Sequence, residues 1–504
     1  MTTPLRLFNS LTREVEEFRP IREGEARVYT CGPTVYNYQH IGNMRAYVFA
    51  DTLGRVLSFK GYDLKHVINI TDVGHLTSDA DAGDDKMEKA ASAAGKSAWD
   101  IAAFYQADFE NDLERLNVRK PQHPRATDYV PQMIEWAQSI EAKHCYRLDS
   151  GLYFDVSTVP DYGRLARAHT DQGESRIEAV AGKRSPLDFA IWRTTPPGET
   201  RQMEWDSPWG RGAPGWHLEC SVMSGALLGF PFDIHTGGID HREIHHPCEI
   251  AQNQAHEGYC EGDQTGARLW MHNNFLIDRT GKMSKSSGEF LRLQALVDRG
   301  FHPLSYRLMC LQAHYRSELE FSWENLLAAQ VRLKRMVMGA SNLYQEVESL
   351  AHHLAATSNV QALDSTFLLR AADITNQRLK DIVKEFETAL SDDLNSAVAL
   401  TLVEKVLGLK GANASERFAV VECMDEALGL NLENATLSRV ALRIRPTSAT
   451  LTEPEIEARL DERKAARVAK DFATSDRIRD ELAAAGVEVM DGDPSFEWDW
   501  KIEL

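Results

Sequence analysis

Apolar residues follow two different periods in the first 70 positions of the chain. The stretches 26–30 and 65–70 are rich in Val, Ile and Tyr, and each is followed by turn-forming residues and then by a helical pattern. Past the first of these turns, apolar residues recur at the spacing of one helical face, at Ala46, Phe49, Leu53 and Val56. Two strands joined by a helix form a βαβ unit, so this region predicts the start of a parallel α/β domain.

Proline and glycine divide the rest of the chain into segments. A second helical pattern covers 101–116, and the prolines of 121–129 end it. The mixed sequence that continues to residue 215 predicts an insertion, after which "FDIHTGGID" (232–240) restores a strand and a glycine turn. Helical spacing dominates 323–430 and predicts a helical bundle. A polar, proline-containing segment (446–454) then leads to a small C-terminal unit.

Composition sets outer limits on these segments. The 504 residues exceed what one core usually serves, so several domains are expected, and 43% apolar residues can fill sizeable cores. A net charge of −19 disfavours indiscriminate nucleic-acid binding but allows a local basic face. No stretch resembles a signal peptide or a transmembrane helix, so a cytosolic protein without membrane contact is expected. The seven scattered cysteines indicate free thiols or metal ligands rather than a disulfide framework.

The segment "YTCGPTVYNYQHIGN" (29–43) joins a strand end, a turn and a helix start. Ligands of open α/β sheets bind at the carboxyl ends of such strands. His40, at the helix start, can donate hydrogen bonds to phosphate oxygens beside the free backbone N–H groups, and Gly42 lets a flat adenine approach the backbone. The tetrapeptide "HIGN" alone is equally compatible with a capping or core role for His40. Cys31 has no evident part in a phosphate site.

A second motif, "GKMSKSSG" (281–288), carries two lysines three positions apart between glycines. Lys282 and Lys285 on a short loop are suited to stabilising the charge that develops on a triphosphate. For an arbitrary pair of lysines a solvated surface turn would be the better interpretation. The five residues "KMSKS", about 240 positions after "HIGN", form a far more specific pattern.

Together, the two motifs resemble the signature motifs of class I aminoacyl-tRNA synthetases. The blocks "CGPTVY", "PGWHLECSVM" (214–223) and "IHHPCEIAQ" (244–252) further resemble cysteinyl-tRNA synthetases, and the similarity runs from "LFNSLTREVEEF" to the C-terminal segment. The implied fold is α/β, with a Rossmann-like parallel-sheet catalytic domain, an insertion, a helical bundle and a small anticodon-binding domain. The implied boundaries are 1–120 and 216–275 for the two catalytic halves, 121–215 for the connective insertion, 276–322 for the stem-contact region with the lysine motif, 323–440 for the bundle and 441–504 for the anticodon-binding domain.

The resemblance implies one active-site zinc ion, with ligands that fall on Cys31, Cys220, His245 and Glu249. Two thiolates, an imidazole and a carboxylate are plausible zinc ligands, and residues four apart on a helix project from one face. The family commonly reads His-His-Glu-Asn-Glu where this chain reads His-His-Pro-Cys-Glu. Cys248 therefore places a soft donor beside Glu249. We favour Glu249, because only that residue stacks above His245 on a helix, and Cys248 then packs as a small buried residue.

The resemblance also implies the reaction and the residues that carry it. Cysteine attacks the α-phosphate of ATP, which binds with Mg²⁺, and the terminal ribose of tRNA(Cys) then accepts the acyl group. The zinc ion selects the cysteine thiolate over the hydroxyl of serine, so no editing domain is required. The implied catalytic and ATP-binding residues are His40, Gly42, Asn43, Asp240, Lys282 and Lys285, and the amino-acid pocket includes Thr34 and Trp216. Asn43 replaces the family's usual closing histidine, although its amide can still donate a hydrogen bond. Trp216 is nearly as well explained as a core aromatic residue.

The C-terminal segment indicates which kind of macromolecule the protein binds. Residues 459–479 carry seven Lys or Arg against four Asp or Glu, and two tryptophans follow that could stack on an unpaired base. This order resembles the family's anticodon-binding domain and predicts tRNA binding by a monomer. Two rival functions remain. A cysteine ligase of mycothiol synthesis would lack this end of the chain, and a non-catalytic tRNA-binding relative would be expected to lose His40 or the two lysines.

Overall fold

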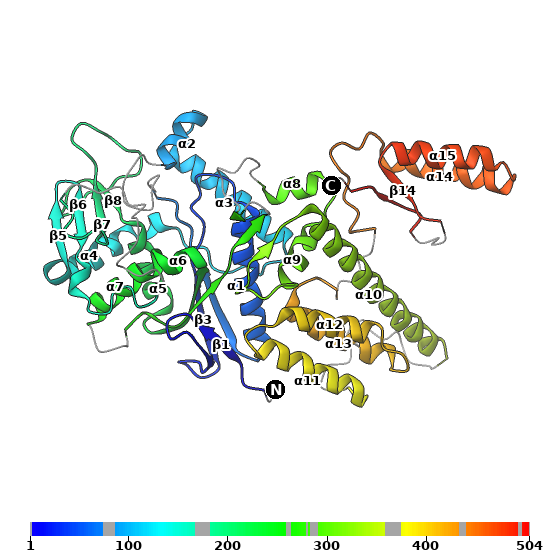
Figure 1. The fold of residues 1–504 in the computed structure, drawn as a ribbon, viewed down its shortest axis with the longest axis horizontal. Coiled ribbons are helices and arrows are strands. Elements are labelled where there is room, and N and C mark those ends of the chain that lie inside the picture. The colour runs from blue at the N-terminus through cyan, green and yellow to red at the C-terminus, as the bar shows by residue number, and fades with distance from the viewer. Residues whose placement is uncertain are drawn as a thin grey trace.

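The computed structural model describes residues 3–73, 86–166, 182–258, 264–278, 281–282, 291–357, 374–432, 440–491 and 496–502, with the backbone alone for 281–282 and 351–357. The molecule is elongated, with the antiparallel sheet of the insertion at one end and the C-terminal hairpin of helices at the other (Figure 1). The central parallel sheet and the helical bundle lie between them.

A four-stranded parallel sheet in the order β10-β9-β3-β4 forms the centre of the catalytic region. Its strands are β3 (Glu25–Thr30), β4 (Asp63–Ile68), β9 (Phe232–Gly238) and β10 (Ala267–Asn273). Helix α1 (Ile41–Phe59) connects β3 to β4, which confirms the βαβ unit predicted from the apolar pattern. The remaining helices around this sheet are α5 (Trp216–Leu228), α6 (Ile239–Glu243) and α7 (His245–Glu257).

Between β4 and α5 the chain adds two groups of elements. Helices α2 (Lys86–Ala94) and α3 (Ala98–Arg115) share a buried cluster with α1, whereas α4 (Val130–His144) and the short 3-10 helices η1 (Ala126–Tyr129) and η2 (Val156–Thr158) pack with an antiparallel sheet. The strands of that sheet, in sequence order, are β5 (Cys145–Leu148), β6 (Gly151–Phe154), β7 (Phe189–Thr194) and β8 (Gly212–Pro214). In Figure 1 this sheet lies on the far left of the molecule.

Shorter elements join the sheet to the bundle and to the N-terminus. They are the hairpin β1 (Arg6–Asn9) and β2 (Glu14–Glu17), the small sheet of β11 (Leu276–Asp278), β12 (Gly281–Lys282) and β13 (Leu319–Glu320), and helices α8 (Leu293–Asp298) and α9 (Pro303–Leu311). Among the helices that the structure describes, none is long and apolar enough to cross a lipid bilayer.

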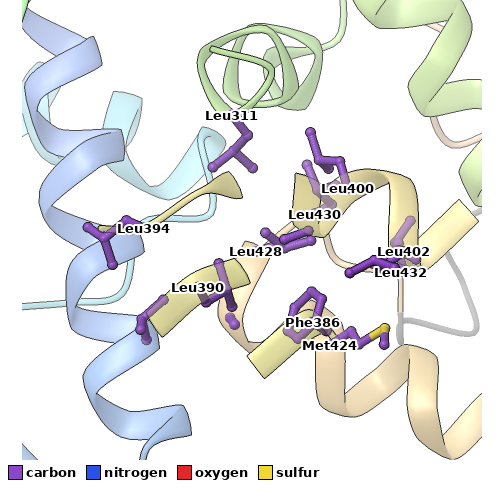
Figure 2. Close-up of a cluster of buried hydrophobic side chains, with 14 of the residues drawn as sticks. Leu311, Phe386, Leu390, Leu394, Leu400, Leu402, Met424, Leu428, Leu430 and Leu432 are labelled. Carbon is purple, nitrogen blue, oxygen red and sulfur yellow. The ribbon is translucent and has the colours of Figure 1, made fainter. Parts of the chain in front are cut away.

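The predicted helical bundle is present and shares its core with the catalytic region. Its helices are α10 (Trp323–Thr357), α11 (Gln377–Ser391), α12 (Ser396–Leu407) and α13 (Ala414–Leu428). Figure 2 shows Leu311 of α9 pointing toward leucines of α12 and of the segment after α13. The same buried cluster includes residues of β3, α1 and β9, so burial of apolar surface couples the bundle to the sheet.

A buried cluster of charged residues joins α1, α9 and the end of α13. The carboxylate of Asp51 in α1 accepts hydrogen bonds from Arg55, at 2.7 Å, and from Arg307 of α9, at 2.6 Å. Burial would raise the pKa of Asp51, but the two guanidinium groups hold it below its usual value. Arg307 also donates to the carbonyl of Leu428, at 2.8 Å, and Arg55 donates to the carbonyl of Glu426, at 3.1 Å. The helix that begins at His40 is therefore bonded to the end of α13.

In the C-terminal unit, the prediction that the two tryptophans could stack on an unpaired base is wrong. Helices α14 (Glu453–Val468) and α15 (Phe472–Ala484) pack on the hairpin of β14 (Val487–Val489) and β15 (Trp498–Trp500). Trp498 and Trp500 are each 3% exposed and lie in the core of the unit, so neither is available to stack on a base. Phe472, at the start of α15, is 62% exposed instead.

The predicted basic face of 459–479 is largely paired. Arg463 and Arg467 both contact Asp491, and Arg459 and Arg477 both contact Glu481. Counting charges over 459–479 therefore overestimated the positive charge of this face, because the partners Glu481 and Asp491 lie just beyond the counted segment.

Candidate active site and metal centre

A pocket of about 330 Å³ opens at the carboxyl edge of the central sheet. Its lining comes from the segments that directly follow three strands: 31–36 after β3, 238–241 at the end of β9, and 273–276 at the end of β10. The start of α1 and Trp216, the first residue of α5, complete the wall. This is the position at which open α/β sheets bind ligands.

Four buried donor atoms gather at the Cys31 side of this pocket. The Sγ atoms of Cys31 and Cys220 lie 3.9 Å apart, and the Cys220 Sγ lies 3.4 Å from the Nε2 of His245. Glu249 Oε1 lies 3.1 Å from His245 Nε2 and 3.8 Å from Cys31 Sγ. Ligands of a tetrahedral zinc-like ion with bonds of about 2.0–2.3 Å are roughly 3.3–3.8 Å apart. The four residues could therefore hold a metal ion with little rearrangement.

Local sequence explains the placement of three of these donors, Cys31, His245 and Glu249. Cys31 directly follows β3, and the backbone N–H of Gly32 donates to the Oδ1 of Asn69, at 2.8 Å. A Cβ on Gly32 would lie 1.5 Å from the backbone oxygen of Asn69, so only glycine permits this close approach. On α7, His245 and Glu249 are one turn apart and face the same side, as the sequence predicts.

Other histidines form a second layer that the sequence analysis missed. His217 Nδ1 lies 2.8 Å from His245 Nδ1. His235 Nε2 lies 2.9 Å from Oε2, the other carboxylate oxygen of Glu249. His246 is bonded to His272 at 2.7 Å. Partners of this kind fix the orientation of metal ligands. Cys31, His235, His246 and Glu249 form an overlapping donor group, in which His246 Nε2 lies 3.3 Å from Cys31 Sγ. The only signal in the sequence is the density of histidines between 235 and 272.

Burial and mutual charge shift the proton affinities of this cluster. Burial would lower the pKa of His245, but Glu249 and Cys220 raise it to about 10. Burial would raise the pKa of Glu249, yet His235 and His245 lower it to about 2. Burial likewise opposes ionisation of Cys220, but hydrogen bonds from Cys31 and His245 lower its pKa to about 6. The cluster thus pairs a protonated His245 with an anionic carboxylate and a thiolate; the latter two are forms that bind a metal cation, whereas His245 would release its proton on binding one.

Cys248 lies outside the donor group. Its side chain is buried, and its Sγ lies 3.5 Å from the hydroxyl of Tyr162, which belongs to the insertion. Neither donor group among the described residues includes Cys248. This arrangement favours Glu249 as the fourth donor.

The first motif forms the start of α1. His40 is the N-cap residue, and its Nδ1 accepts a hydrogen bond from the backbone N–H of Gly42, at 2.9 Å. A neutral imidazole that accepts at Nδ1 carries its hydrogen on Nε2, so His40 presents a donor. Asn43 closes a capping box, because its Oδ1 accepts from the backbone N–H of His40 at 3.3 Å. His40, Gly42 and Asn43 all line the pocket.

The other predicted site residues fall into two groups. Thr34, Trp216 and Asp240 line the same pocket, and the Trp216 ring lies 4.3 Å from that of His245. Lys282 lies in β12, where the structure describes the backbone alone, and Lys285 lies outside the described residues. His241, which the sequence analysis did not single out, also lines the pocket, and its Nδ1 accepts from the backbone N–H of Gly238 at 3.2 Å.

Comparisons with known proteins agree with this arrangement. Residues 17–331 match the family of tRNA synthetases class I (C) catalytic domains, and residues 451–498 match the cysteinyl-tRNA ligase anticodon binding domain. The chain is 63% identical over 505 residues to a cysteine–tRNA ligase of Novosphingobium aromaticivorans, covering 99% of this chain and 98% of that protein. A cysteine–tRNA ligase of Zymomonas mobilis is 52% identical over 514 residues and is covered to 99%.

Solved structures share the fold at low sequence identity. A methionyl-tRNA synthetase of Mycobacterium tuberculosis bound to methionyl-adenylate superposes with a TM-score of 0.53 at 16% identity, over 83% of this chain and 93% of that one. A LeuRS of Agrobacterium radiobacter in a ternary complex with tRNA and LeuAMS gives 0.57 at 12% identity, over 97% of each chain.

The parallel sheet, the pocket at its carboxyl edge and the matching catalytic-domain family define a class I aminoacyl-tRNA synthetase. Within that class, the catalytic and anticodon-binding matches and the two close relatives show that the chain belongs to the cysteinyl-tRNA ligase family.

Proposed function

We propose that this chain ligates cysteine to tRNA(Cys) through a cysteinyl adenylate, at the expense of ATP. The observation that carries the proposal is that the four metal donors lie at one end of the pocket at the carboxyl edge of the central sheet. Cys31 belongs to both, since it is one of the four donors and also lines the pocket beside His40 and Trp216. A metal-bound amino-acid side chain would thereby lie within reach of ATP.

The pocket divides into two sides with different chemistry. On the ATP side, the Nε2–H of His40 donates to phosphate oxygens, Gly42 lies under the adenine, and Asn43 orients His40 through the capping box. Asp240 accepts from the ribose hydroxyls, and Mg²⁺ accompanies the phosphates. Lys282 and Lys285 stabilise the charge of the departing pyrophosphate. On the amino-acid side, Thr34 and Trp216 enclose the cysteine.

The proposed metal is one zinc ion per chain, bound by Cys31, Cys220, His245 and Glu249. The spacing of the four donor atoms and the anionic forms favoured at Cys220 and Glu249 support this assignment. When bound, zinc supplies a soft Lewis acid that prefers the thiolate of cysteine to the hydroxyl of serine. His217 and His235 hold two of the ligands, His245 and Glu249, in orientation.

The tRNA partner is supported by the anticodon-binding match at 451–498. Phe472 offers an exposed ring there, while Trp498 and Trp500 build the core. The presence of this unit also argues against the mycothiol-type cysteine ligase. We further propose that the domains follow the boundaries expected from the sequence, with the insertion at 121–215 and the bundle at 323–440.

The test is ATP–pyrophosphate exchange with cysteine and with serine, followed by charging of total tRNA. We expect exchange with cysteine alone and charging of tRNA(Cys). Lys285→Ala should lower exchange by at least ~10², because one donor to the transition state is lost. Lys410→Ala, at an exposed turn of the bundle, is the matched control and should leave exchange intact. Equal exchange with serine would refute selection by a metal-bound thiolate, and exchange without tRNA charging would refute the assignment of the second substrate.

A further inference from the structure

Arg292, immediately before α8, joins two elements that flank the first motif. Its guanidinium carbon lies 3.2 Å from the ring centroid of Tyr38, and its Nη2 donates to the Oδ1 of Asp108 in α3, at 3.3 Å. The Arg292 and Asp108 side chains are 29% and 22% exposed, so this ion pair is mostly shielded from solvent. Arg292 is also the N-cap residue of α8, but its side chain makes no capping hydrogen bond. Its side chain is directed at other elements instead.

Tyr38 belongs to the chain segment that forms one wall of the pocket. Its neighbours Tyr36, Gln39 and His40 all line the pocket, whereas Tyr38 itself is not one of the lining residues. Tyr105 and Phe104 in α3 make T-shaped contacts with its ring at centroid distances of 5.0 and 6.1 Å. The ring is thus held between the Arg292 guanidinium and α3. A planar guanidinium with several fixed donors can stack and form an ion pair at once, which an ammonium group cannot do.

A second bond ties the same segment to the first motif. The carbonyl of Leu291 accepts a hydrogen bond from the backbone N–H of Ile41, at 2.9 Å. The carbonyl of Ile41 in turn accepts from the hydroxyl of Tyr306, at 2.6 Å. Residues 291–292 therefore contact the chain on both sides of His40, at Tyr38 and at Ile41.

We propose that Arg292 is a positioning residue for adenylate formation, acting through Tyr38 to hold the pocket wall and His40 in place for ATP. The proposal rests on the proposed function above. Catalytic groups must be held within a fraction of an ångström of their productive geometry, and a displacement of about 1 Å can cost ~10² in rate. Arg292 is neither one of the pocket-lining residues nor one of the metal donors.

The same helix provides a matched control. Arg299, at the C-terminal end of α8, stacks on Trp323 with its guanidinium carbon 4.1 Å from the ring centroid. Arg299→Ala removes an arginine–aromatic contact from α8 without touching Tyr38 or the pocket. If Arg292 only stabilised α8, the two alanine variants would behave alike.

The experiment measures ATP–pyrophosphate exchange and Tm for Arg292→Ala, Arg292→Lys, Tyr38→Leu, the double variant Arg292→Ala/Tyr38→Leu and Arg299→Ala. We expect Arg292→Ala to lower kcat/KM for ATP by about tenfold or more, while KM for cysteine changes by less than about twofold. Arg292→Lys should recover only part of the loss, because it keeps the charge and loses the stack. The double variant should lose less than the sum of the two single losses, because both single changes break the contact between Arg292 and Tyr38.

Several results would overturn the proposal. These are equal losses of exchange in Arg292→Ala and Arg299→Ala, a loss confined to Tm, additive losses in the double variant, or full recovery by lysine. If Arg292→Ala does not fold, Arg292→Lys and Tyr38→Leu give the same comparison. Failure of the wild-type protein to catalyse exchange with cysteine would instead refute the proposed function, so the two failures are distinguishable.

Discussion

The sulfur atoms of Cys31 and Cys220 lie 3.9 Å apart although 189 positions separate the two residues. One cysteine follows a strand and the other lies within a helix, so their approach depends on how α5 packs beside the central sheet. With His245 and Glu249, they place two sulfurs, one nitrogen and one oxygen where a tetrahedral ion could bind.

Removing one of these sulfurs should remove the metal. Cys220→Ser replaces a thiolate with a neutral hydroxyl, which is a poor zinc ligand. We expect purified Cys220→Ser to lose most of its zinc and its exchange activity. Cys248→Ser is the matched control, since that sulfur faces Tyr162, and it should retain about one zinc per chain, the number a single four-donor site holds. Metal analysis by mass spectrometry checks both. Zinc loss in Cys248→Ser, with retention in Glu249→Ala, would show that the fourth ligand has moved by one residue.

Asp112 should make the folded protein less stable as pH rises. Burial raises the pKa of this carboxyl from 3.8 to about 6, and repulsion by Asp108 adds to the effect against the opposing charges of Arg115 and Arg292. Between pH 4 and 6 the unfolded chain therefore releases its proton first, and stability falls by up to about 3 kcal/mol. Asp112→Asn should gain stability relative to wild type on going from pH 4 to 7.5.

Denaturant unfolding at both pH values measures that change. Glu114→Gln, at an exposed position of the same helix, is the control and should show no such gain. A pH-independent difference between Asp112→Asn and wild type would mean that the pKa of Asp112 is the same in the folded and the unfolded state.

Phe472 should contribute to tRNA recognition without affecting adenylate formation. Stacking of a base on an exposed aromatic ring is worth about 1–3 kcal/mol, so Phe472→Ala should raise KM for tRNA by roughly tenfold. Val468→Ala, at a residue that is 86% exposed, should have little effect because it removes no ring. Trp498→Ala should lower Tm instead, since it removes a core side chain. Aminoacylation kinetics, exchange and thermal unfolding separate these outcomes. Unchanged charging by Phe472→Ala would exclude a stacking role.

Gly429 should be essential for docking of the bundle on α1. It adopts φ +65° at the end of α13, and a Cβ there would lie 2.6 Å from Arg307 Nη2 and 2.7 Å from the Arg55 guanidinium. Gly429→Ala should therefore destabilise the protein by about 1–3 kcal/mol. Gly408 ends α12 at φ −88°, and its nearest contact would be at 3.5 Å. Gly408→Ala should thus be tolerated in the same thermal unfolding assay. Equal Tm values for the two variants would contradict this account of the junction.

Local pattern was sufficient for several parts of this protein. The helix that starts after His40 and the strands beside it follow from the apolar spacing, because one face of each element must be buried. The pairing of His245 with Glu249 follows from the helical repeat alone. Where an interaction spans one or two turns of a single element, the residue spacing already contains its geometry.

Errors arose where distant segments decide exposure. Trp498 and Trp500 were predicted to be available for stacking on a base, but they pack against α14 and α15 in the core of the unit. The exposed aromatic ring there is that of Phe472. The basic stretch at 459–479 lost much of its apparent charge to Asp491 and Glu481. Whether a side chain is buried or paired depends on what packs against it, and spacing along the sequence does not contain that information.

The sequence by itself determined the class of fold and the two signature motifs and, through resemblance, pointed to the four proposed metal donors. The tertiary structure alone decided that Cys31 and Cys220 meet across 189 positions, that His217 and His235 contact His245 and Glu249, and that Arg292 reaches Tyr38. The physical reason is that these contacts join separate elements. Burial of apolar surface brings such elements together without regard to their distance along the chain.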